Sequence, residues 1–441
     1  MTRLTACLAV ALSASAVAAQ GPGAVEGASP GAGEAPVAAE VVPPIAPAVT
    51  PFDAAEATRV YLDRMTPEKR ARSDAYFEGG YWLQLWGFLY GLGVAWLLLG
   101  SGISRRLRDW SARVGRRRPL GNWLYAAAYV VLSTLLAFPL IAYQGFYREH
   151  QYDLATQTFP EWLRDQAVGL GVALALYPLL LVALYGVFRK APRTWWLWGG
   201  AVSLAFLVFV VLIAPVYIDP LFNEYKPLAD QRVKEEILSL ARSSGIETND
   251  VWQFDASRQT TRVSANVAGF MGTMRVRLND NLLNRCTLPE IKAVMGHEIG
   301  HYALNHVYES ILFFGVVLVA GFAFLSWAFE AARRRWGARW GVEGIADVAG
   351  LPLLNVILSL YFFLLTPILN THSRVNEAEA DIYSLHASRE PDGFAEVALK
   401  LGEYRKLEPG TFEEWFFYDH PSGRARIAMA MDWKAEALQR P

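Results

Sequence analysis

The sequence predicts a mostly α-helical, multi-pass membrane bundle with six spans, and three observations lead to this fold class. Apolar residues make up 53% of the 441 residues and charged residues only 19%, a balance that is unusual for a soluble protein. Six stretches are long and apolar enough to cross a bilayer, which takes about 20 residues at about 1.5 Å each. Trp and Tyr residues stand near many of their ends, as is typical of membrane surfaces. The six stretches are residues 81–103, 122–144, 167–188, 195–217, 310–330 and 349–370.

The segments before and between the spans differ in composition. Residues 1–19 predict a secretory signal peptide, because Arg3 precedes an apolar stretch that ends in small residues; a short uncleaved anchor is the alternative. Residues 20–76 are predicted as an extracytoplasmic N-terminal region, which begins as a disordered, Pro- and Ala-rich tether up to about Pro51. The remaining predicted divisions are four spans in 77–217, a polar part in 218–309, two spans in 310–370 and a second polar part in 371–441.

The first polar part has the pattern of an α+β unit. Apolar residues recur at helical spacing at Val233, Ile237, Leu238 and Ala241. Three short strands are predicted at 251–257, 262–270 and 274–280, with glycines 269 and 272 in a hairpin. A helix is predicted at 288–308, running almost directly into the fifth span, and the second polar part is predicted to be mostly helical. The α+β part is therefore split around the last two spans.

Charge and cysteine content exclude some classes of protein. The net charge of −1 offers no basic excess for nucleic acid, so no nucleic-acid partner is predicted. Cys7 and Cys286 are the only cysteines, which excludes a disulfide framework, and Cys286 is expected to be a small apolar residue. The spans hold almost no ionisable residues, which disfavours a transporter.

One stretch, KAVMGHEIGHYALNH, carries residues with catalytic potential. His297 and His301 are one helical turn apart, so both imidazoles project from one face and can share a metal ion. Glu298 is placed to act on a water bound to that ion. This HExxH spacing predicts one Zn²⁺ per chain, with Glu298 as the base that accepts a proton from the water. A buried helix that happens to contain histidines is the competing interpretation.

A catalytic zinc site needs a third protein ligand, and the sequence offers alternatives. A histidine six residues after the motif is one known solution, but that residue is Val307. His306 is expected to point away from the metal face and to be a structural residue or one that supports a ligand, rather than a ligand itself. Glu377 is a candidate, with Asp381 one turn later to orient a ligand; Glu379 lies about 200° around the helix from it. From spacing alone, two interpretations of Glu377 fit equally well: a metal ligand, or a solvated charge on the helix surface.

Five motifs follow one another in the second half of the chain: YIDPLFNEYKPL, SANVAGF with RVRLNDNLL, GHEIGHYALNH, SRVNEAEAD and HPSGRARI. In this order they resemble the integral-membrane CAAX prenyl proteases (type I, zinc-dependent) and their bacterial relatives. The resemblance covers most of the chain from about Tyr129 onward. It implies a zincin-like α+β catalytic domain and a membrane endopeptidase that acts on membrane-associated or C-terminal polypeptides. The alternative is a catalytically weak membrane protein that only binds substrates or acts as a scaffold.

The resemblance also implies roles for single residues. It gives the zinc ligands His297, His301 and Glu377, the base and acid Glu298, the supporting residue Asp381, the substrate and oxyanion contacts His420 and Arg426, and the substrate-backbone contact Asn266. From the residues alone, Asn266 would be interpreted as a turn residue and Arg426 as a solvated charge. An edge-strand asparagine fits an extended peptide that adds as a strand beside a cleft.

Basic residues predict the orientation in the membrane. The short loops after the first, third and fifth spans hold fourteen Lys and Arg residues, whereas the loop at 145–166 holds only Arg148 and Arg164. Short basic loops stay in the cytoplasm, and the signal-like N-terminus places the residues after it outside. We therefore predict a monomeric, multi-pass protein of the inner membrane with its catalytic parts on the periplasmic face.

Overall fold

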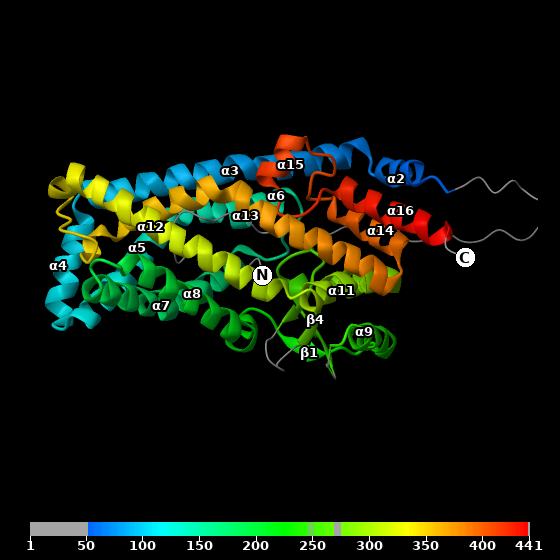
Figure 1. Cartoon of the computed structure of the whole chain (residues 1–441), viewed down its shortest axis with the longest axis horizontal. Coiled ribbons are helices and arrows are strands. Elements are labelled where there is room, and N and C mark those ends of the chain that lie inside the picture. Colours follow the sequence, from blue (N-terminus) through cyan, green and yellow to red (C-terminus); the bar gives the residue numbers. More distant parts are fainter. Residues whose placement is uncertain (1–51, 247, 249, 269–274, 440–441) are drawn as a thin grey trace, which may run out of the picture.

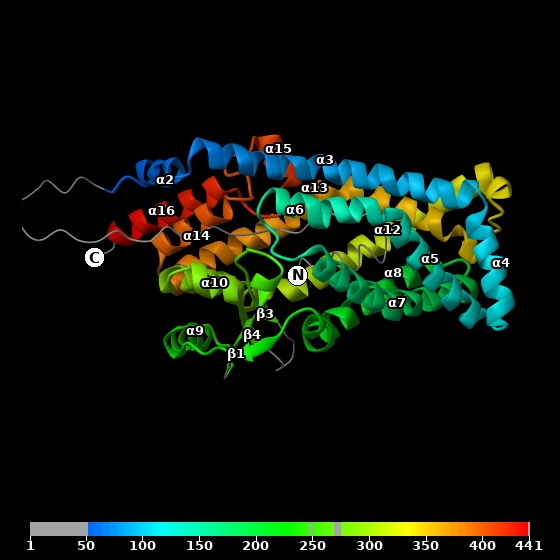
Figure 2. The ribbon, with the colours of Figure 1, turned by 180° about the vertical axis from the view of Figure 1, so that it is seen from behind.

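The computed structural model describes residues 52–246, 248, 250–268 and 275–439. The molecule is elongated, with the long helices running along its axis and the sheet and shorter helices gathered at one end (Figure 1). Helix α4 lies across the opposite end, as the view from behind also shows (Figure 2). The predicted signal peptide and most of the predicted tether lie outside the described residues.

The prediction of six membrane spans is confirmed by six long apolar helices. Their outward faces carry large apolar side chains, such as Trp96 and Trp327, which are 69% and 70% exposed. Such exposure is unfavourable in water and expected in lipid. Between the helices, the rings of Tyr125, Tyr185 and Phe322 are almost fully buried. The spanning helices are α3 (Pro67–Gly100), α5 (Arg118–Ala142), α7 (Phe159–Lys190), α8 (Trp195–Ile213), α12 (His306–Trp340) and α13 (Leu351–Ser388).

The basic segment after the first span is a helix, α4 (Ile103–Gly115), where the sequence suggested a loop. Ser104 donates a hydrogen bond to the carbonyl of Ala349 at 2.7 Å, and Arg108 forms an ion pair with Asp347 at 2.8 Å. These contacts attach α4 to the start of α13. The basic loops therefore gather at the end of the bundle that is opposite the sheet.

A four-stranded sheet lies in the first polar part. Its strands are β1 (Tyr225–Pro227), β2 (Val251–Phe254), β3 (Ala265–Ala268) and β4 (Arg275–Asn279). The order is β1-β2-β4-β3, with β2 and β4 parallel and the other pairs antiparallel. The three predicted strands are present. β1 was missed because three residues are too short to show an alternating pattern.

Most of the remaining helices pack against the sheet or against one another. Ile237 of α9, Val276 of β4 and Met295 of α11 belong to one buried cluster under the sheet. A second cluster joins α2 to the C-terminal helices, where Tyr61 donates to Asp392 at 2.9 Å. Part of the predicted N-terminal region is therefore folded against α14 and α16. These helices are α2 (Ala54–Asp63), α6 (Arg148–Gln151), α9 (Gln231–Ser243), α10 (Asp280–Arg285), α11 (Leu288–Ala303), α14 (Pro391–Leu401), α15 (Thr411–Phe417) and α16 (Gly423–Gln439).

Candidate metal centre

Three side chains from two helices converge on one point. His297 and His301 come from α11 and Glu377 from α13, and one ligand atom from each lies within 4.8 Å of the others. Nε2 of His297 lies 3.1 Å from Nε2 of His301 and 3.1 Å from Oε2 of Glu377. Nε2 of His301 lies 3.5 Å from Oε1 of Glu377. The sequence reasoning that preferred Glu377 over Glu379 is consistent with this geometry.

The spacing of these atoms fits a metal ion. Ligands about 2.0–2.1 Å from a tetrahedral zinc stand about 3.3 Å from one another, and the separations of 3.1 and 3.5 Å lie on either side of that value. Oε2 of Glu377 is buried and accepts no hydrogen bond from the described residues, although Nε2 of His297 is close. Lone pairs that face one another repel unless a cation lies between them. The donor set of two imidazoles and one carboxylate therefore suits a divalent metal.

Two glycines allow α13 to approach α11 so closely. Gly296 and Gly300 are one turn apart, and each directly precedes a motif histidine. A Cβ atom on Gly296 would lie 3.2 Å from the Cα atom of Ser384, and one on Gly300 would lie 3.2 Å from the Cα atom of Ala380. A larger residue would push the two backbones apart. The glycines therefore bring the carboxylates of α13 opposite the histidines of α11.

Asp381 supports the imidazole of His297 from behind. Nδ1 of His297 donates to Oδ1 of Asp381 at 2.7 Å, which leaves the Nε2 lone pair for the metal. Arg426 of α16 donates to the same oxygen. Burial alone would raise the pKa of Asp381, but Arg426 and His297 hold it below its ordinary value. Arg426 is only 8% exposed and lies behind Asp381, so it supports an ionised carboxylate here.

The motif helix is broken directly after the motif. α11 ends at Ala303, Asn305 adopts a left-handed conformation with φ of 61°, and α12 begins at His306. Asparagine tolerates this conformation better than most residues. The break turns His306 back, so that its Nδ1 lies 2.9 Å from Nδ1 of His301. The predicted direction of His306 was wrong because it assumed a continuous helix, whereas the prediction that His306 supports a ligand rather than acting as one is consistent with this contact.

One arrangement of protons satisfies the contacts of His306. If Nε2 of His301 faces the metal, its Nδ1 carries a proton and donates to Nδ1 of His306. Nε2 of His306 then carries the proton that faces Oε2 of Glu379 at 3.1 Å. Burial lowers the pKa of His306, which keeps the ring neutral, as this arrangement requires. Glu379 is thus connected to the metal centre by hydrogen bonds through His306 and His301.

Replacing His306 with Ala is expected to weaken metal binding roughly 10–100-fold, because Nδ1 of His301 loses its acceptor and the ring loses its fixed orientation. Competition with a chelator measures the affinity. His386→Ala is the matched control, since His386 is exposed and contacts Trp433 on α16. Equal affinities for the two variants would contradict the role of His306.

A fourth imidazole approaches from the second polar part. Nε2 of His420 lies 3.2 Å from Oε2 of Glu377, and its Nδ1 donates to Oδ1 of Asp419 at 2.8 Å. Asp419 therefore fixes the ring so that Nε2 faces the centre. The sequence reasoning singled out His420 but missed Asp419. The only indication of Asp419 in the sequence is that it directly precedes His420.

The charged groups of the centre shift one another's pKa. Burial alone would lower the pKa of His297, but Asp381 and Glu377 raise it to about 10. Burial alone would raise the pKa of Glu377, but His420, His297 and His301 hold it well below its usual range. A proton and a metal ion therefore compete for the same atoms, and we expect metal binding to weaken as the pH falls.

Glu298 and Asn266 complete the set of predicted site residues. Glu298 follows His297 on α11 and forms no hydrogen bond or ion pair with any residue that the structure describes. Asn266 lies on β3, the edge strand next to β4, where it pairs with Arg277. Oδ1 of Asn266 is buried and has no hydrogen-bond partner among the described residues. β3 packs against α11, so the edge strand runs beside the metal helix.

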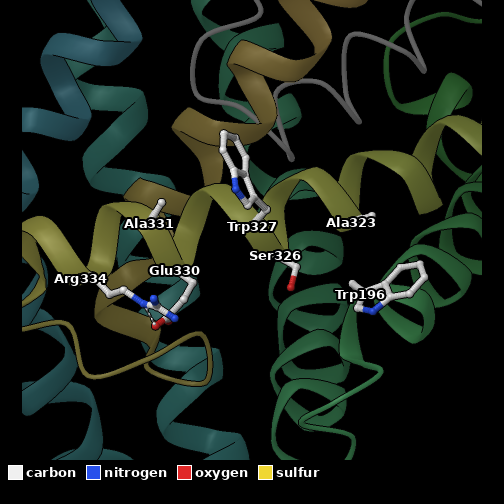
Figure 3. Close-up of a pocket in the computed structure, with 7 residues that line it drawn as sticks. All are labelled: Trp196, Ala323, Ser326, Trp327, Glu330, Ala331 and Arg334. Carbon is white, nitrogen blue, oxygen red and sulfur yellow. Dashed lines mark hydrogen bonds and ion pairs between the residues drawn. The ribbon is translucent and has the colours of Figure 1, made fainter.

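A cavity of about 460 Å³ lies far from the metal centre, on the flank of the membrane bundle (Figure 3). It is lined by residues of α8 and α12, which are Trp196, Ala323, Ser326, Trp327, Glu330, Ala331 and Arg334. From His306 to Glu330, α12 rises about 36 Å. Within the cavity, Arg334 donates to Glu330 at 2.9 Å. The cavity therefore takes no part in the metal site.

Two sequence families match the chain. Residues 227–434 match peptidase family M48, and residues 54–224 match the CAAX prenyl protease N-terminal family, which is described as five membrane helices. The described residues within 54–224 contain four candidate spans. The two matches together cover the membrane bundle, the sheet and both helices that carry the metal centre.

Individual relatives agree with these families. The chain is 28% identical to an uncharacterized metalloprotease, YhfN, of Bacillus subtilis, over 83% of this chain and 86% of the relative. It is 27% identical to CAAX prenyl protease 1 of Saccharomyces cerevisiae, over 69% of this chain and 70% of the relative. The crystal structure of S. mikatae Ste24p has the same fold, with a TM-score of 0.71 and 20% identity over 86% of this chain and 95% of that one.

The His-His-Glu cluster at the end of a membrane bundle, in a chain whose relatives are proteases, places this protein among the membrane metalloproteases. It belongs to peptidase family M48, in the branch whose N-terminal half matches the CAAX prenyl proteases. The resemblance noted in the sequence is thus confirmed, and the alternative of a scaffold or substrate-binding protein is not favoured.

Proposed function

We propose that the chain is an endopeptidase that holds one Zn²⁺ on His297, His301 and Glu377 and hydrolyses peptide bonds of membrane-associated polypeptides. The convergence of three ligand atoms within 4.8 Å supports this proposal most strongly. When bound, the zinc ion supplies a positive charge that polarises the scissile carbonyl and acidifies a water. Asp381 and His306 keep the two imidazoles in the tautomers that such an ion requires.

In this proposal Glu298 takes a proton from the attacking water and passes it to the leaving amine. Its carboxylate has no partner among the described residues, so it can accept that proton. Nε2 of His420 faces the centre, and in the imidazolium form, in which Nδ1 still donates to Asp419, it can donate to the oxygen on which negative charge develops. The position of Arg426 behind Asp381 favours a supporting role over direct contact with the substrate.

The substrate is proposed to bind as an added strand beside β3. An edge strand offers backbone groups to an extended peptide, and the unpartnered Oδ1 of Asn266 can accept a hydrogen bond from its main chain. We further propose that 218–309 and 371–441 form one catalytic domain and that the protein acts as a monomer, since one chain supplies all three ligands. The net charge of −1 favours no nucleic-acid partner.

The natural substrates are proposed to be membrane-associated or periplasmic polypeptides rather than prenylated peptides. The predicted signal peptide favours a bacterial envelope protein, and no motif in the sequence encodes recognition of a prenyl group. Comparing the peptides of membrane and periplasm in cells that make the wild type or Glu298→Gln tests this. Peptides that accumulate only with the wild type identify substrates, and identical peptide sets would argue against a proteolytic role.

The catalytic face is proposed to be periplasmic, because the basic residues gather at the opposite end of the bundle. Alkaline phosphatase, which is active only outside the cytoplasm, is expected to be active when fused after Pro441 and inactive when fused after Arg117. A stably made but inactive fusion at Pro441 would place the metal centre in the cytoplasm.

A further inference from the structure

Helix α15 (Thr411–Phe417) has its polar and apolar faces reversed relative to a helix in water. Phe412 is 67% exposed and Trp415 is 47% exposed, whereas the acidic residues between them, Glu413 and Glu414, face inward. In a water-soluble domain the carboxylates would be outside and the rings inside. A short helix with this pattern is unfavourable unless its outer face meets an apolar medium.

Both inward carboxylates have hydrogen-bond partners. Glu413 accepts a hydrogen bond from the hydroxyl of Tyr81 at 2.7 Å and forms an ion pair with Lys406 at 3.1 Å. Glu414 accepts a hydrogen bond from the backbone N–H of Ser422 at 2.9 Å. These contacts fix the rotation of α15 about its axis. The exposure of Phe412 and Trp415 is therefore a consequence of the fold and not of a loosely attached segment.

The contacts of α15 also fix its depth along the bundle. Tyr81, whose ring stacks on Phe417 at 3.8 Å between centroids, stands where the sequence places the start of the first span. Asn370, which donates to the carbonyl of Phe416 at 2.7 Å, stands where the sequence places the end of the sixth span. Figures 1 and 2 both show α15 at the outer edge of the bundle beside α3. The helix thus lies level with the predicted start of the first span and the predicted end of the sixth.

We propose that α15 is an interfacial anchor whose Phe412 and Trp415 side chains insert into the lipid leaflet on the catalytic side. The partner is the phospholipid bilayer, because exposed apolar side chains also stand beside the contacts of α15, at Trp82 of α3 and Ile368 of α13. Aromatic residues favour this depth, and interfacial helices bury their apolar face about 5–10 Å into the headgroup boundary. This inference does not depend on the proposed peptidase activity.

The anchor has a consequence for the metal centre. Tyr418, Asp419 and His420 follow α15 directly, and Arg374 of α13 donates to the carbonyls of Glu414 and Tyr418. The loop that carries His420 is therefore held between a spanning helix and a helix in the membrane surface. A bound lipid leaflet would place His420, and the substrate that it contacts, next to the membrane.

The test uses a polarity-sensitive fluorophore attached to Cys at position 412. Phe412→Cys is made in a chain with Cys7→Ser and Cys286→Ser, labelled, and placed in phosphatidylcholine nanodiscs. Leu438→Cys is the matched control, since Leu438 is also apolar and 64% exposed but lies near the end of α16, far from the spans. Quenching is measured with a nitroxide on the lipid acyl chain and with iodide in the water.

The label at 412 is expected to be quenched several-fold more strongly by the lipid nitroxide than the label at 438, and several-fold less by iodide. Iodide quenching at 412 equal to that at 438 would overturn the proposal. Shielding of 412 from both quenchers would also overturn it, because a second copy or another segment of the chain would then cover α15. Trp415→Cys, labelled in the same way, repeats the measurement if Phe412→Cys is not folded.

Discussion

Glu298→Gln is expected to retain the metal ion while losing peptide hydrolysis by roughly 10²–10⁴-fold. The metal remains because Glu298 is not one of the three converging ligands. Hydrolysis falls because an amide cannot accept a proton from the attacking water. Metal content by mass spectrometry and cleavage of a peptide by the purified protein in detergent measure the two effects.

The change keeps the size and shape of the side chain, and Glu298 has no hydrogen-bond partner among the described residues, so a folding defect is not expected. Glu309→Gln is the control, since Glu309 lies one turn into α12 with a 54% exposed side chain. A variant with a full complement of metal and undiminished turnover would remove Glu298 from the mechanism.

Glu377→Ala is expected to lose metal and activity together, because it removes one of three ligands and leaves two imidazoles facing an empty site. Glu379→Ala is the matched control two residues away on the same helix. The Glu379 side chain is 53% exposed, and among the described residues its carboxylate forms an ion pair only with His306 at the edge of the centre, so we expect the Glu379→Ala variant to retain the metal.

Metal titration of the apo protein distinguishes these variants without reference to any substrate. If Glu379→Ala stripped the metal while Glu377→Ala did not, the third ligand would be assigned to the wrong carboxylate. Loss of metal in both variants would show that metal binding requires the contacts from Glu379 through His306 to His301, even though the Glu379 side chain is exposed.

Much of this protein follows from patterns that are local in sequence. A span needs about 20 apolar residues in a row, so the six spanning helices could be found without knowing how they pack. The placement of His297 and His301 on one face depends only on the helical repeat. Glu377 and Asp381 likewise share a face because they are four residues apart on one helix.

Some local features escaped the same reasoning. The three residues of β1 are too few for an alternating pattern, and the segment of α4 was described only as a basic loop between two spans. His306 was placed on the wrong side because a single left-handed residue, Asn305, ends one helix and lets another begin. Nothing in the apolar pattern marks that break.

The sequence by itself thus determined the membrane bundle, the two imidazoles of the candidate metal centre and the helix that carries its carboxylate. Tertiary structure alone decided what surrounds them: Arg426 behind Asp381, Glu379 behind His306, and the reversed faces of α15. These arrangements result from close packing between helices, such as that of α13 on Gly296 and Gly300 of α11. A helical repeat fixes directions around one axis, whereas the contacts between helices depend on how several axes cross, which no local pattern encodes.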